Sequence, residues 1–255
     1  MTPPATSKTI LITGASSGLG AEMARQFAVL GHDLALCARR TDKLEALRDE
    51  IATLAPHCRV GIRALDVTDD DQVFAVFRAF AEDFGSIDRV VINAGLGKGA
   101  PLGTGRYDAN RATAMTNFVA ALAQSEAALE IFRAQNAGHL VMISSMSAMR
   151  GLPKTLTTYA ATKAGVAHLA EGIRNEFHGL GTIKVTVLYP GYIASEMNEQ
   201  VAQEVKLMTS TEKGVRSMVK AIEKEVASAH VPALPWAALA PVLRFAPLGV
   251  VKKLS

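Results

Sequence analysis

Cysteine is scarce in this chain, since only Cys37 and Cys58 occur among 255 residues. Two thiols are too few for a disulfide framework in a chain of this length, and they lack metal-ligand spacing. We therefore expect a reducing compartment, the cytoplasm. The histidines are scattered as well, and we interpret all six as loop or surface residues that hold no metal: His32, His57, His139, His168, His178 and His230.

A strong excess of charge is also missing. The formal net charge is +3, and the charged residues are dispersed along the chain. Because there is no basic stripe, the sequence does not predict binding to nucleic acid. The first eight residues form a polar lead without an apolar stretch, so we expect no secretory signal. With a hydrophobic share of 49%, the chain has enough apolar residues for a large core.

The strongest local signal is a glycine-rich turn near the amino terminus. Residues 8–13 form a short apolar, β-branched run typical of a buried strand, and helical spacing begins directly after segment 14–20, which reads GASSGLG. Glycines allow the backbone to approach an anion closely, and the first turn of a helix offers unpaired N–H groups. We predict that this turn binds the phosphates of a nucleotide, although such turns also occur for packing reasons. The predicted contacts are Gly14, Ser16, Ser17, Gly18, Leu19 and Gly20.

Strands and helices are predicted to alternate along the chain. The expected strands are residues 8–13, 32–38, 58–65, 87–92, 138–143 and 183–188. The later helices are expected at 107–135, 157–177, 196–207 and 211–227. This alternation predicts an α/β fold, a doubly wound parallel, Rossmann-like sheet with helices on both faces. We expect a single dinucleotide-binding domain over residues 1–255, with an apolar, proline-rich extension at about 231–255.

Glycine, proline and polar residues follow the carboxyl ends of the predicted strands. In parallel α/β sheets, ligands bind outside these ends. The pattern therefore predicts one common site. Its members at the strand ends are Gly14, Arg39, Asp66, Asn93, Ser144, Ser145 and Pro190.

Arg39 and Arg40 follow Ala38, the last residue of the second predicted strand. A carboxylate there would bind the ribose 2′-hydroxyl of NAD and repel the extra phosphate of NADP. A guanidinium can instead pair bidentately with that phosphate. We predict NADP(H) as the cofactor, with Arg39 dominant and Arg40 weaker. The alternative is that both are ordinary surface arginines before a helix.

Tyr159 and Lys163 are four residues apart on a predicted helix and share one face. A phenol titrates near 10 in water, and a nearby ammonium favours the phenolate. The pair is therefore a candidate for acid–base chemistry, although a tyrosine beside a solvated lysine is common on helices. Ser144 or Ser145, just upstream, offers a hydroxyl to a substrate oxygen. Asn117 is mildly unfavourable inside its helix and is either functional or a plain surface residue.

Six motifs occur together and in order. They are TGASSGLG at 13–20, NAG at 93–95, Asn117, Ser145, YAATK at 159–163 and PG at 190–191. Each motif is modest alone, but the set is specific, and the chain resembles the short-chain dehydrogenase/reductase family over residues 8–197. The family implies hydride transfer between a nicotinamide and a hydroxyl or carbonyl carbon.

The resemblance also implies roles for individual residues. Tyr159 would be the acid or base, and Lys163 would lower its pKa and hold the nicotinamide ribose. Ser145 would orient the substrate oxygen, and Asn117 would support a proton-relay water. The remaining cofactor contacts implied by the family are Asp66 and Val67 at the adenine, Asn93, Ala94 and Gly95 along the cofactor, and Pro190, Gly191 and Ile193 at the nicotinamide.

The chain departs from the family pattern in three places. The connection from Ser145 to Tyr159 is one residue longer than the commonest spacing, so Ser144 remains a weaker candidate. Ser195 stands where the family more often has a threonine at the nicotinamide amide, and its hydroxyl is kept. The chain lacks the terminal Asp-Gly-Gly strand that supports many tetramers. We therefore expect a homodimer through the long helices around Asn117 and Tyr159.

Apolar residues are expected around the mouth of the site, which favours an apolar alcohol or carbonyl substrate, although core filling explains them equally well. They are Met146, Met149, Leu152, Pro153, Tyr192, Met197 and Met208. The segment 231–251 has one charge, Arg244, and four prolines, so it is too weak to span a bilayer. We expect it to pack over the substrate end or across a dimer. The side chains expected to turn inward are Trp236, Leu239, Leu243 and Phe245.

These observations predict an NADP(H)-dependent oxidoreductase that interconverts an alcohol and a ketone or aldehyde. The alternative from another class is a catalytically silent NADP(H)-binding regulator or scaffold with the same fold. A sugar-nucleotide epimerase is disfavoured by the glycine spacing and the modest length. For the tail, peripheral attachment to a membrane surface, helped by Lys252 and Lys253, is the alternative to packing on protein.

Overall fold

The computed structural model describes residues 7–97, 99–194 and 208–249. Within these residues, seven strands form one sheet in the order β3-β2-β1-β4-β5-β6-β7, and every neighbouring pair is parallel. The strands are β1 (Thr9–Thr13), β2 (Asp33–Ala38), β3 (Val60–Ala64), β4 (Arg89–Ile92), β5 (Gly138–Ile143), β6 (Ile183–Pro190) and β7 (Ser228–Val231). The strand order reverses between β1 and β4, so the predicted doubly wound sheet is confirmed.

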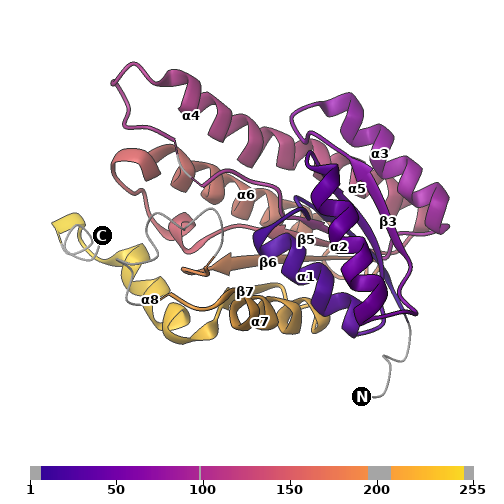
Figure 1. Ribbon diagram of the computed structural model, residues 1–255. Helices are drawn as coiled ribbons and strands as arrows, with labels where there is room; N and C mark the ends of the chain where they lie inside the picture. The colour runs from indigo at the N-terminus through magenta and orange to yellow at the C-terminus, as the bar shows by residue number, and fades with distance from the viewer. Residues whose placement is uncertain (1–6, 98, 195–207, 250–255) are drawn as a thin grey trace.

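Helices cover both faces of the sheet (Figure 1). The helices α1 (Gly18–Val29), α2 (Thr41–Leu54) and α7 (Thr211–Glu223) share one apolar core with the sheet. The helices α3 (Asp70–Phe84), α5 (Ala120–Gln135) and α6 (Thr157–Glu176) share the core on the opposite face. Because the central strands are buried on both faces, their sequences are nearly continuous apolar runs.

The long helix expected over residues 107–135 is interrupted by a π-helical turn. It consists of α4 (Tyr107–Ala114), the π-helical segment η1 (Met115–Val119) and α5. Asn117 lies in this turn and is only 1% exposed, so its interpretation as a surface residue is wrong. Single π-helical turns inside α-helices occur frequently at functional sites.

The carboxyl-terminal part contains one strand that the sequence did not predict, followed by a helix. The strand β7 pairs with the end of β6, from Val187↔Ser228 to Pro190↔Val231. Helix α8 (Ala233–Phe245) follows at once and includes Pro241. The helix expected at 196–207, together with Ser195, Met197, Lys252 and Lys253, lies outside the described residues.

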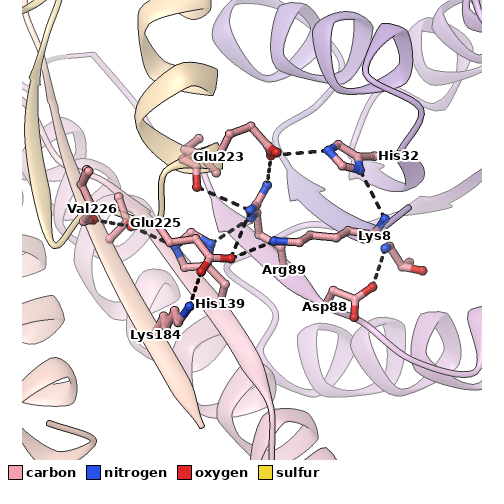
Figure 2. A network of polar contacts seen from close by, with 12 residues as sticks. Lys8, His32, Asp88, Arg89, His139, Lys184, Glu223, Glu225 and Val226 are labelled. Carbon is pink, nitrogen blue, oxygen red and sulfur yellow. Dashed lines mark hydrogen bonds and ion pairs between the residues drawn. The ribbon is translucent and has the colours of Figure 1, made fainter. Parts of the chain in front are cut away.

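A buried polar network lies at the amino ends of the strands (Figure 2). Arg89 is fully buried, and its guanidinium donates to Nδ1 of His139 at 2.9 Å and to the carboxylate of Glu223. Because Nδ1 accepts, Nε2 of His139 carries the proton and donates to Thr186 Oγ1 at 2.8 Å. The assignment of all histidines to loops or the surface is wrong for His139 (3% exposed) and His32 (0%), because polar partners replace water around both rings.

Candidate active site

The glycine turn between β1 and α1 forms a close-fitting cradle. Gly14 and Gly18 have φ of 64° and 54°, in the left-handed region that favours glycine. A β-carbon on Gly20 would lie 2.4 Å from the carbonyl oxygen of Gly14. Ser17 precedes α1 without capping it through its side chain, so the first turn keeps N–H groups available to an anion. The local geometry therefore fits the phosphates of a dinucleotide.

The end of β4 is hydrogen-bonded to the end of β1. The side-chain amide of Asn93 donates to the carbonyl oxygens of Thr13 at 2.9 Å and Gly14 at 3.3 Å. The hydroxyl of Thr13 accepts from the backbone N–H groups of Asn93 and Ala94 at 3.1 and 3.2 Å. This reciprocal arrangement holds the segment Asn93, Ala94 and Gly95 beside the glycine turn.

The two arginines after β2 are both exposed but differ in their contacts. Arg40 donates to Ser17 Oγ at 2.6 Å and to Ser16 Oγ at 3.3 Å, which places it on the glycine turn. Arg39 lies near Asp66. The pKa of Asp66 is lowered, mainly by the backbone N–H of Thr68, with a smaller contribution from the charge of Arg39. Val67 is buried beside Asp66.

Ser144 and Ser145, which follow β5, have different partners. Ser144 is 2% exposed, and its hydroxyl donates to the carbonyl oxygen of Lys163 at 2.7 Å, so it is occupied inside the protein. Ser145 Oγ accepts from the backbone N–H of Ser147 at 3.1 Å, and its side chain is near enough to Tyr159 to lower the pKa of that phenol. Of the two candidates, Ser145 is therefore the one that faces the tyrosine.

Lys163 is buried beneath Tyr159. Its ammonium donates to the carbonyl oxygen of Ile143 at 2.8 Å and lies 5.9 Å from the centre of the Tyr159 ring. Burial lowers the pKa of Lys163 to about 8. Burial also raises the pKa of Tyr159, with the hydrogen bond from Ser145 acting in the opposite direction and the nearby Tyr192 raising it further. The expected lowering of the pKa of Tyr159 is thus not observed in the protein alone, because desolvation outweighs the effect of its neighbours.

Asn117 reaches the same place from the π-helical turn. Its side chain donates to the carbonyl oxygen of Leu96 at 2.9 Å and accepts from the Leu96 N–H at 2.7 Å. A β-carbon on Gly95 would lie 3.2 Å from Asn117 Oδ1 and 3.6 Å from Lys163 Nζ. The four predicted catalytic side chains therefore converge beside the loop that follows β4.

Asn110 is a positioning residue that the sequence analysis missed. Its Oδ1 accepts from the backbone of Ala100 at 3.1 Å and from the hydroxyl of Thr158 at 2.8 Å. It thereby joins the loop before α4 to the start of the helix that carries Tyr159. The only available signal was a second asparagine on the same helix as Asn117, seven residues earlier.

Helix α8 covers the side of the site that follows β6. Trp236 is 6% exposed and packs with Met146, from the short helix η2 (Met146–Met149) that follows Ser145. Its ring meets Tyr192 edge to face, with 5.7 Å between centroids. Leu239 and Leu243 are partly buried against the same cluster, as expected.

The structure also places the predicted residues around Gly191, three residues expected at the mouth of the site, and Phe245. Pro190 and Ile193 are buried on either side of Gly191, directly after β6. Leu152 and Met208 are half-buried, whereas Pro153 is exposed. Phe245 is 76% exposed, so the expectation that it turns inward is wrong. It is the last residue of α8 and lies beyond the cluster around Trp236.

The described residues contain no group of three or more histidine, cysteine, aspartate or glutamate side chains able to hold a metal ion. Likewise, no helix in the described ranges is long and apolar enough to cross a membrane.

A glycine turn, a parallel sheet and a Ser–Tyr–Lys group at the carboxyl ends of the strands together define a dinucleotide-binding oxidoreductase. Comparisons with known proteins agree. The family model for short chain dehydrogenases matches residues 8–206. An uncharacterized oxidoreductase of Mycobacterium tuberculosis (strain H37Rv) is 48% identical over 250 residues, covering 98% of each chain. The chain belongs to the short-chain dehydrogenase/reductase family.

Solved structures show the same fold with either nicotinamide cofactor. A short-chain dehydrogenase/reductase from Burkholderia phymatum in complex with NAD has a TM-score of 0.82 at 21% identity, covering 97% of this chain and 95% of that one. An alcohol dehydrogenase from the archaeon Thermococcus sibiricus, complexed with 5-hydroxy-NADP, has a TM-score of 0.78 at 24% identity, with 90% and 97% covered.

Proposed function

We propose that this protein is an NADP(H)-dependent oxidoreductase that interconverts an apolar alcohol and its ketone or aldehyde. The proposal depends mainly on one observation, the placement of Tyr159 between the side chain of Ser145, which lowers its pKa, and the buried ammonium of Lys163. A phenol held in this way can donate a proton to a carbonyl oxygen or accept one from a hydroxyl.

The chemistry divides between cofactor and protein. When bound, a nicotinamide cofactor would supply or accept the hydride at the substrate carbon. In the reductive direction, Ser145 and Tyr159 both donate hydrogen bonds to the carbonyl oxygen and stabilise the charge that develops on it. The proton of Tyr159 passes to that oxygen and completes the alcohol. Lys163 stabilises the resulting phenolate, and Asn117 holds the adjoining backbone of Leu96 for the water through which the phenolate is reprotonated.

The preference for NADP(H) is assigned to both arginines after β2. Arg40 is already on the glycine turn, while Arg39 projects beside Asp66. Two guanidinium groups, without a carboxylate at the end of β2, suit a 2′-phosphate better than a 2′-hydroxyl. We also propose that the hydroxyl of Ser195 contacts the nicotinamide amide, as the family resemblance implies.

The substrate, assembly and location are inferred from side chains. Met146, Met149 and Trp236 make the substrate side apolar.

Exposed Phe118 and Leu122, on η1 and α5, support a homodimer through the long helices. Cys37 and Cys58 are both free thiols, which suits the cytoplasm. We also propose that residues 1–255 form one domain, with an apolar extension from about residue 231.

Following the oxidation of NADPH across aliphatic, aromatic, steroid and quinone carbonyls tests this function. We expect turnover of at least one apolar class, with NADPH preferred to NADH. Inactivity across the whole panel by a protein that still binds NADPH would replace the proposal with a regulatory role.

A further inference from the structure

The most exposed apolar side chains fall into two groups. Among the large apolar residues that the structure describes, five are at least 65% exposed, namely Leu102, Tyr107, Leu234, Phe245 and Leu248. The first two belong to the loop before α4 and its first turn, and the other three to α8 and the turn after it. Single apolar residues on a surface need no explanation, but this clustering does.

The C-terminal group is attached to the connection between Ser145 and Tyr159. Arg150, in that connection, donates to the carbonyl oxygens of Arg244 at 3.1 Å and Ala246 at 2.8 Å. These carbonyls belong to the end of α8 and the residue after it. The exposed end of α8 is therefore fixed directly beside the substrate side of the site.

The other group is attached to the far end of the same connection. The backbone N–H of Gly99 donates to the carbonyl oxygen of Thr155 at 3.0 Å, and Thr158 donates to Asn110. In Figure 1, the loop before α4 and the end of α8 both extend past the carboxyl ends of the strands, at the left of the view. The segments that carry the two apolar groups therefore both lie toward the carboxyl ends of the strands, and Tyr192, which follows β6, is 39% exposed.

The charged side chains of the C-terminal segment itself are all of one sign, although Glu171 of α6 lies in the same pocket as Arg244. From Val226 to Ser255 the sequence contains the cations Arg244, Lys252 and Lys253 and no aspartate or glutamate. Exposed apolar side chains beside cations are typical of helices that lie in the headgroup region of a membrane, and a tyrosine such as Tyr107 suits that region. We propose that α8 and the loop before α4 bind the surface of an anionic membrane, with the carboxyl ends of the strands facing the lipid.

A lipid surface fits this geometry better than a protein partner. The exposed apolar side chains of α8 are accompanied by cations and no acidic residue on their own segment, which suits anionic headgroups, and a bilayer would bring apolar molecules to the side of the sheet that carries the site. That orientation relies on the proposed oxidoreductase function with an apolar substrate. The binding itself does not, because it depends only on exposed side chains and charge.

Sedimentation of the full-length protein with vesicles tests the proposal. We expect the wild type to sediment with vesicles of phosphatidylcholine and phosphatidylglycerol, more weakly with phosphatidylcholine alone, and less at high salt. The double variant Phe245→Ser/Leu248→Ser should lower the partition coefficient by about tenfold or more. Leu102→Ser/Tyr107→Ser should act in the same direction.

Leu180→Ser is the matched control, because Leu180 is 64% exposed but precedes the amino end of β6, at the other end of the strands from the site. It should sediment like the wild type. Wild-type protein that stays in the supernatant, or double variants that sediment unchanged, would overturn the proposal. In the first case, a smaller mass of the double variant in solution would identify the surface as an interface between copies. Protein that sediments but reduces no carbonyl would overturn the proposed function alone.

Discussion

The indole ring of Trp236 occupies the space beside Gly191, where an added β-carbon would lie 2.0 Å from ring atoms Cε2 and Nε1. Gly191 directly follows β6, and Trp236 belongs to α8. The absence of a side chain at this one position therefore lets the C-terminal helix close against the sheet. The same contact joins the predicted nicotinamide side of the site to the substrate side.

Gly191→Ala should consequently destabilise the protein by about 1–3 kcal/mol, because the methyl group overpacks the contact with Trp236. Trp236→Ala removes a large buried ring and should cost about 3–5 kcal/mol. In the double variant the methyl group has room, so the cost of Gly191→Ala should largely vanish. Urea unfolding of all four proteins measures this coupling. Strictly additive costs would show that the two residues do not interact as described.

Arg39 and Arg40 should both contribute to cofactor preference, with Arg39 the larger contributor. Removing a guanidinium that pairs with the 2′-phosphate leaves that phosphate less neutralised, so Arg39→Ala should lower the NADP/NAD ratio of kcat/KM by about tenfold or more. Arg40→Ala should have a smaller effect, and because Arg40 bonds to Ser17, it should also weaken NAD binding. Measuring kcat/KM with NADP and with NAD for both variants tests how much each arginine contributes to this preference. An unchanged ratio in Arg39→Ala would refute the assignment.

Lowering the pH should destabilise the protein in two stages, because side chains of the polar network around Arg89 become protonated. Burial and the charge of Arg89 lower the pKa of His139 to about 3, against 6.5 for an exposed histidine. The unfolded chain therefore takes up a proton that the folded protein refuses. The contribution of neutral His139 to the free energy of unfolding is fully present above pH 6.5. It decreases as the pH falls toward 3, with a slope of up to about 1.4 kcal/mol per pH unit.

Glu223 and Glu225 act at lower pH. Burial opposes their ionisation, but His32 and Arg89 beside Glu223, and Lys184 and Lys8 beside Glu225, outweigh it and lower both pKa values from 4.5 to about 2. Their contribution is present above pH 4.5 and is lost as the pH falls toward 2. His139→Gln should flatten the dependence of unfolding free energy between pH 6.5 and 4.5. His168→Gln, an exposed control, should not. Equal slopes in both variants would contradict this account.

The fold was largely predictable because its units are local. Buried strands such as β1 are apolar runs, and glycine turns and helical spacing follow them directly. β7 was not predictable, since its four residues are stabilised by pairing with β6 at the edge of the sheet. The burial of His139 was also inaccessible, because its partner Arg89 is 50 residues away.

The site was predictable where motif and strand end coincide, as for Ser145 and Tyr159. The π-helical turn around Asn117 was not, because a local change in the hydrogen-bond pattern leaves no clear period in the sequence. The role of Arg150 in holding α8 was missed for another reason. Its acceptors are backbone carbonyls 94 and 96 residues away, which no side-chain pattern reveals.

The central claim is that Tyr159 transfers the proton, and the most direct test is kcat for carbonyl reduction by Tyr159→Phe. The variant keeps the ring and removes only the phenolic hydroxyl. Its free energy of unfolding and its NADPH affinity should stay close to those of the wild type. Its kcat should fall by at least ~10², the usual contribution of general acid–base catalysis. A correctly folded Tyr159→Phe protein that binds NADPH and keeps wild-type kcat would contradict the mechanism.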